Sequence, residues 1–205
     1  MFSSTSLTST IDHAGGRIAD GLFEELDQRY SEPGRHYHNR DHIAGCLQLL
    51  NTYAHLAEHS DHIALAIWFH DAIYDTHSVD NEEQSAALAK TWLTKCGLTP
   101  ETISHVSDMV LATTYHEASD PDTRLMVDID LCILGAPGHI FDAYNQNIRR
   151  EYHWVPSSTY IEKRIEVLQS FLDRPRIYQN QNIIDQYEHP ARNNLSRALK
   201  ALQAE

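Results

Sequence analysis

The chain has 205 residues, of which 41% are hydrophobic and 22% charged, a composition typical of a globular protein with one sizeable core. Its formal net charge is −13, from 16 Lys and Arg against 29 Asp and Glu. This charge argues against long nucleic acid as a partner, because no basic stripe can displace counterions from a phosphate backbone. A small phosphorylated ligand stays compatible with it, since a few arginines beside a metal ion can hold a phosphate.

The first residues and the cysteines bear on the location of the protein. Residues 1–10 are rich in Ser and Thr and lack the basic and apolar regions of a signal peptide, so we expect a frayed start. Cys46, Cys96 and Cys132 are widely spaced in apolar stretches, which indicates reduced core thiols in a cytoplasmic protein. The longest apolar run has about seven residues, too short for a membrane span.

Helical periodicity extends through nearly the whole chain, and no stretch shows a sustained alternation typical of strands. The helical pattern is interrupted where Pro and Gly residues cluster. Thr99 followed by Pro100 is typical of a helix start. The sequence therefore predicts an all-α fold, with a single domain over residues 1–205. The predicted helices are 11–30, 39–58, 61–74, 80–96, 100–116, 122–135, 137–153, 158–172 and 180–203.

An apolar run over residues 63–69 ends on the adjacent pair His70 and Asp71. If the helix continues, the side chain of His70 points into apolar surroundings, with Asp71 beside it. Burying a carboxylate is costly unless a cation or several donors meet it. A divalent metal ion would meet that requirement. The alternative is a pair satisfied by backbone groups or by a distant arginine.

Two further groups of histidines have helical spacing. His38 and His42 are four residues apart and share a face of a helix that begins near Asn39. One can bind a metal ion while the other faces a substrate, or both can belong to a solvated helix start. A second group, His55, His59 and His62, lies among polar residues at a helix end, and we expect it at the surface.

Asp128 and Asp130 are two apart and cannot share a helix face. Asp130 has apolar neighbours one turn away on both sides, whereas Asp128 has Arg124 as a salt-bridge partner. The pattern therefore favours Asp130 as a metal ligand and Asp128 as a structural residue. The resulting nitrogen and oxygen ligand set suits a divalent ion such as Mn, Mg, Zn, Ni, Co or Fe, and it consists of His42, His70, Asp71 and Asp130.

This ordered set resembles the HD superfamily of metal-dependent phosphohydrolases, all-helical bundles whose ligands follow the order H…HD…D. From about residue 22 to 200 the chain is similar to the small bacterial proteins identified as predicted HD-superfamily phosphohydrolases, most clearly over residues 35–39, 68–74, 80–86 and 130–135. The element from Tyr37 to His42 is also similar to one in cyclic-nucleotide phosphodiesterases, a branch of that superfamily. The resemblance implies that His42 binds the metal ion and that His38 donates a proton.

Acidic residues after the HD pair are candidates for orienting the attacking water. Asp75 lies one turn beyond Asp71, and Glu82 and Glu83 stand at a predicted helix start. Glu82 can equally be a surface acid that complements the helix dipole.

Basic residues are candidates for contacts with the substrate. Arg35 is the first candidate, because a fixed guanidinium binds phosphate in bidentate fashion, and Arg149 is a second. His116 resembles an extra ligand found in some two-metal HD enzymes. It can serve a second metal ion or the substrate, or it can be a helix C-terminal histidine favoured by the macrodipole.

The resemblance implies a hydrolase that acts on a phosphate monoester or a nucleotide through a metal-activated water. Its partner would be a small phosphorylated substrate. The alternative is a non-catalytic metal-binding HD domain that senses a nucleotide. A structural helical protein without a stoichiometric metal ion is the third possibility.

Overall fold

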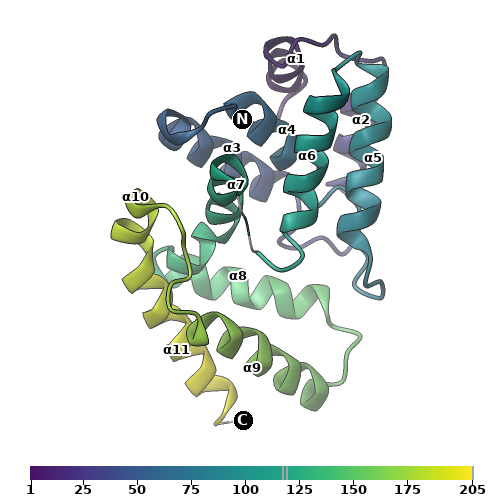
Figure 1. Ribbon diagram of the computed structural model, residues 1–205. Coiled ribbons are helices and arrows are strands. Elements are labelled where there is room, and N and C mark those ends of the chain that lie inside the picture. Colours follow the sequence, from purple (N-terminus) through teal and green to yellow (C-terminus); the bar gives the residue numbers. More distant parts are fainter. Residues whose placement is uncertain (117, 119, 205) are drawn as a thin grey trace. The chain divides into compact units, whose positions relative to one another are not determined.

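The computed structural model describes residues 1–116, 118 and 120–204 (Figure 1). These residues contain no strand, which confirms the predicted all-α fold. They include ten α-helices of eight residues or more, close to the nine predicted, and one α-helix of three residues, α10. The α-helices are α1 (Ser4–His13), α2 (Leu22–Arg29), α3 (Arg40–Tyr53), α4 (Ser60–Phe69), α5 (Asn81–Lys95), α6 (Pro100–Ala112), α7 (Pro121–Leu131), α8 (Gly138–Glu151), α9 (Ser157–Asp173), α10 (Gln181–Ile183) and α11 (His189–Leu202).

The start of the chain differs from the expectation. The Ser/Thr-rich segment expected to be frayed forms α1, because Ser3 caps it by accepting a hydrogen bond from the N–H of Ser6 and its apolar face is fully buried. The helix predicted over 11–30 is broken into α1 and α2. Gly15 and Gly21, with φ of +86° and +84°, adopt the left-handed conformation that ends one helix and precedes the next.

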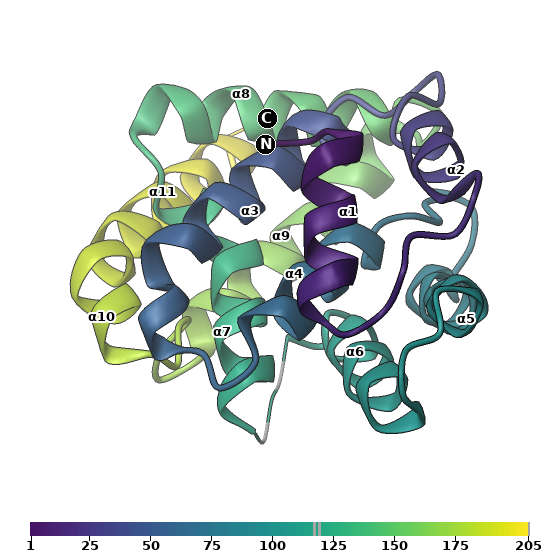
Figure 2. The ribbon, with the colours of Figure 1, turned by 90° about the horizontal axis from the view of Figure 1, so that it is seen from above.

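The chain divides into two compact units, Met1–Ile129 and Asp130–Glu205, and the single domain predicted over residues 1–205 stays a prediction. In the first unit α4 packs against α1, α3, α5 and α6, and Figure 2 shows α1 lying across it. All residues of α4 from Ile63 to Phe69 are buried. A helix that is apolar on every side belongs in a core, so α4 is the central element of this unit.

In the second unit α9 packs against α11, and α11 also packs against the 3₁₀ turn Cys132–Gly135 (Figure 1). Asn194 on α11 donates its side-chain N–H groups to the carbonyl oxygens of Leu134 and Ala136, 2.9 and 2.8 Å away. A Cβ atom at Gly135 would lie 2.7 Å from the backbone oxygen of Tyr187. Only glycine therefore permits this close approach of the two backbone segments.

Cys46, Cys96 and Cys132 are buried free thiols, as the prediction of reduced core thiols requires. No helix in the described part of the chain combines the length and the apolar character needed to cross a membrane.

Gly135→Ala should lower the free energy of unfolding by about 1–3 kcal/mol, because the added methyl group overlaps the backbone of Tyr187. Gly45→Ala in α3 is the matched control. An added Cβ there meets no atom within 4 Å, so we expect a gain of about 0.5–1 kcal/mol from the better helix propensity. Urea denaturation measures both values, and equal stabilities would contradict the close approach at Gly135.

Candidate metal centre

Three potential ligand atoms meet in the first unit. Nε2 of His42 lies 3.1 Å from Nε2 of His70 and 3.3 Å from Oδ2 of Asp71, and the last two atoms are 3.0 Å apart. Two ligands about 2.1 Å from one ion stand roughly 3.0 Å apart at a right angle and roughly 3.4 Å apart at a tetrahedral angle. The triangle therefore has the size of one face of a metal coordination shell, and the group can hold a metal ion.

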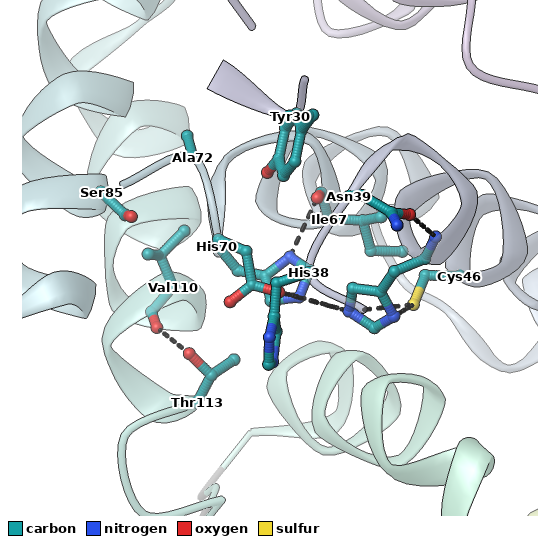
Figure 3. A network of polar contacts seen from close by, with 12 residues as sticks. Tyr30, His38, Asn39, Cys46, Ile67, His70, Ala72, Ser85, Val110 and Thr113 are labelled. Carbon is teal, nitrogen blue, oxygen red and sulfur yellow. Dashed lines mark hydrogen bonds and ion pairs between the residues drawn. The ribbon is translucent and has the colours of Figure 1, made fainter. Parts of the chain in front are cut away.

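The start of α3 positions His42. Asn39 is the N-cap, and its side-chain oxygen accepts hydrogen bonds from the N–H groups of Asp41 and His42, as the predicted helix start requires. His42 is thereby fixed in the first turn with its ring buried. One turn later the thiol of Cys46 lies 3.7 Å from Nδ1 of the same ring (Figure 3).

The end of α4 positions His70. The helix stops at Phe69, and Nδ1 of His70 lies 3.0 Å from the carbonyl oxygen of Ile67 (Figure 3). A carbonyl oxygen only accepts, so Nδ1 carries the proton and donates it. The lone pair of the neutral ring is then on Nε2, which faces His42 and Asp71. Metal-binding histidines use this arrangement to fix their tautomer and ring orientation.

Asp71 supplies a negative charge to the group, with its side chain 19% exposed. Burial alone would raise its pKa. In the metal-free protein the positive charge of protonated His70 and His38, and the hydrogen bonds that protonated His42 and His70 donate, hold the pKa well below its usual value. The carboxylate is therefore ionised, as a metal ligand must be.

Arg35 is held by acceptors of the protein itself. Its Nη1 donates to the carbonyl oxygens of Asp71 and His38, 2.6 and 3.2 Å away, and Nη2 donates to that of Ala72 at 2.9 Å. Nε and Nη2 also contact the carboxylate of Glu32, each at 3.0 Å. All five N–H donors thus have protein acceptors, and the predicted contact of Arg35 with phosphate stays a prediction. The side chain instead ties the loop before α3 to the turn after α4.

Two positioning residues escape prediction from the sequence. The hydroxyl of Ser85, on the buried face of α5, accepts from the N–H of Ile73 at 3.0 Å and lies 3.3 Å from its carbonyl oxygen. The hydroxyl of the buried Tyr30 donates to the carbonyl oxygen of Trp68 at 3.0 Å. A serine on the apolar face of α5 indicates a buried hydrogen-bonding role for Ser85. No pattern in the sequence, however, pairs Tyr30 with Trp68.

His38 lies beside the three ligand atoms (Figure 3). Its ring stacks on that of Tyr74, with centroids 4.1 Å apart, and its centroid is 6.0 Å from that of His42. The ring is half-buried and does not belong to the converging group of ligand atoms. A position next to the centre is compatible with proton donation, which stays a prediction.

The other predicted site residues of the first unit are Asp75, Glu83 and His116. Asp75 is exposed, and its carboxylate accepts from the backbone N–H of His77 at 2.9 Å and contacts Nδ1 of that ring at 3.2 Å. Glu83 is exposed in the first turn of α5. His116 follows α6 in the left-handed conformation, with φ of +54°, so it is not the last residue of that helix. Their predicted contacts with water, substrate or a second metal ion stay predictions.

The remaining predicted residues belong to the second unit. Asp130 is its first residue and is half-buried, and its part in the ligand set stays a prediction. Arg149 donates to the carbonyl oxygens of Tyr152 and Val155, and its guanidinium lies 4.5 Å from the ring centroid of Tyr160. These contacts hold the turn after α8, and the predicted contact of Arg149 with a substrate stays a prediction.

No model of a known protein family matches this chain, and neither does any curated protein or solved structure. The chemistry of the centre therefore follows from its side chains alone. Two imidazoles and a carboxylate suit Mn, Fe, Co, Ni or Zn. Three protein ligands leave coordination positions open for water or substrate.

Arg35→Lys should lower the free energy of unfolding by about 2–4 kcal/mol, because an ammonium group cannot replace the fixed guanidinium and leaves buried carbonyl oxygens unpaired. It should also weaken metal binding, since the turn that carries Asp71 loses its restraint. Arg40→Lys is the control: this side chain is 46% exposed beside Asp27, and we expect a loss below about 1 kcal/mol. Urea denaturation that finds the two variants equally stable would remove the positioning role of Arg35.

Proposed function

We propose that this protein is a metal-dependent phosphohydrolase of the HD superfamily that acts on a phosphate monoester or a nucleotide. The convergence of His42, His70 and Asp71, with ligand atoms 3.0–3.3 Å apart, is the observation that carries this proposal. The order of these residues in the sequence, H…HD, supports the superfamily, and the ionised Asp71 supports a divalent cation.

In this proposal His42, His70 and Asp71 hold one divalent ion. Such an ion lowers the pKa of a bound water and polarises a phosphoryl oxygen. His38 donates a proton to the leaving oxygen. Its stacking on Tyr74 restricts the ring to a small range of orientations, which is what a positioned general acid needs.

A metal-binding domain that senses a nucleotide without hydrolysing it is the second candidate. It is favoured by the place of Asp75, whose exposed carboxylate accepts a hydrogen bond from the backbone N–H of His77. Incubation of phosphate monoesters and nucleotides with the Mn²⁺, Mg²⁺, Co²⁺ or Ni²⁺ protein separates the two. Release of inorganic phosphate supports the hydrolase, whereas binding with recovery of the unchanged ligand supports the sensor.

His70→Ala should remove the metal ion bound at the centre, because the variant loses one of three converging ligands. His13→Ala, at the exposed end of α1, should bind as much metal as the unaltered protein. Elemental analysis of protein purified without a chelator or a metal-affinity tag, before and after reconstitution with Mn²⁺, measures the occupancy. Equal occupancy in both variants would show that His70 is not a ligand.

His38→Ala should leave metal occupancy unchanged and reduce turnover by roughly 10²–10⁴, the usual contribution of a general acid. The loss should be much smaller on a nitrophenyl phosphate than on a nucleotide, because a good leaving group hardly needs the proton. His36→Ala, an exposed neighbour, should retain full activity on both substrates. Loss of metal in the His38 variant, or equal losses on the two substrates, would contradict the proton-donor role.

A further inference from the structure

A second group of imidazoles lies at the other end of α4, within the first unit. His59 directly precedes α4, His62 is in its first turn, and His105 faces them from α6. Nδ1 of His62 lies 3.0 Å from Nδ1 of His105, and the ring centroids of His59 and His62 are 4.8 Å apart. His62, expected at the surface, is half-buried because α6 packs against α4 there.

The proton positions in this group leave a lone pair facing inward. Nε2 of His105 lies 3.4 Å from Oδ1 of Asp120, the residue that precedes α7. A carboxylate only accepts, so Nε2 carries the proton, and Nδ1 of the neutral ring turns its lone pair toward His62. An imidazole with a carboxylate behind it is the usual arrangement of a metal-binding histidine. The 3.0 Å between the two Nδ1 atoms equals the spacing of two ligands at roughly 90° on one ion.

Carboxylates complete the surroundings. On the α4 side, His59, Asp61 and His62 each offer a ligand atom, and these three atoms lie within 4.8 Å of one another. His105 adds Nδ1 from α6, 3.0 Å from Nδ1 of His62. The first turn of a helix ordinarily disfavours cations. Here Asp122 offsets that effect, because its carboxylate accepts from the backbone N–H groups of Glu58 and His59, 2.7 and 2.9 Å away.

We propose that His59, Asp61 and His62, with His105 beside His62 on α6, form a second metal site for a borderline transition-metal ion such as Zn²⁺. Imidazole-rich sets favour Zn²⁺ over Mg²⁺. The site is distinct from the proposed hydrolytic centre. His62 and His70 are eight residues apart along α4, a helical rise of about 12 Å, which one ion cannot bridge. Because its ligands come from α4 and α6, an ion bound here links the two helices and stabilises the folded unit.

Zinc binding to the full chain tests the site. Titration with zinc sulfate against a chromophoric chelator should give one Zn²⁺ fewer in His62→Gln and in His105→Gln than in the unaltered protein. His55→Gln is the matched control, since His55 is an exposed histidine close by that is not part of the group, and it should bind as much Zn²⁺ as the unaltered protein. Equal stoichiometry in all four proteins, or an equal loss in His55→Gln, would overturn the proposal.

A spectroscopic measurement separates this site from the proposed centre and does not depend on a single variant. The His70→Ala protein, reconstituted with Co²⁺, should show visible d–d absorption from the second site. Adding His62→Gln or His105→Gln to that protein should abolish the absorption, while circular dichroism confirms that the helices remain. If the His70→Ala protein shows no absorption and its melting temperature does not rise with Zn²⁺, the second site does not exist, whatever the result for hydrolysis.

Discussion

The hydrogen-bond requirement at the C-terminus of α4 is the constraint on which the candidate centre depends. A helix leaves its last four carbonyl oxygens without helical partners, and water cannot supply them where the helix end is buried. Here the backbone N–H of His70 donates to Ala66 and that of Ala72 to Phe69. The hydroxyl of Tyr30 donates to Trp68. The fourth oxygen, on Ile67, accepts from the ring of His70 itself, and this bond sets the His70 tautomer.

The backbone groups of residues 71–73, which follow α4, also need hydrogen-bond partners. Arg35 donates to the carbonyl oxygens of Asp71 and Ala72, and Ser85 hydrogen-bonds both backbone groups of Ile73. The turn after α4 is therefore held by side chains from the loop before α3 and from α5. The helix ends also favour the charges at the centre. The C-terminus of α4 favours a cation, and the N-terminus of α3, which carries His42, favours the carboxylate of Asp71.

The sequence was sufficient for the fold class and for expecting a group of His and Asp side chains that can hold a metal ion. The burial of His70 and Asp71 was predictable because the apolar run before His70 forces the pair into the interior, where a carboxylate needs a compensating charge. His42 was distinguished from His38 only by the family resemblance. The role of Arg35 was not predictable. Its acceptors are mainly backbone oxygens, and a backbone oxygen leaves no trace in residue type. The helix predicted over 61–74 was too long for a similar reason, since the apolar pattern continues through Ile73 while the helical hydrogen bonds stop at His70.

The two histidine groups at the ends of α4 show why spacing alone cannot identify a metal site. Both contain histidines three or four residues apart, and the sequence distinguished them only by the polarity of their neighbours. In the structure each group is completed by residues from elsewhere in the chain, His70 and Asp71 for His42, and His105 for His62. In each group an acceptor, a carbonyl oxygen or a carboxylate, fixes the proton on one ring nitrogen and leaves the lone pair on the other. A ligand set is thus made by tertiary packing, and the orienting acceptor is the feature that separates it from a cluster of surface histidines.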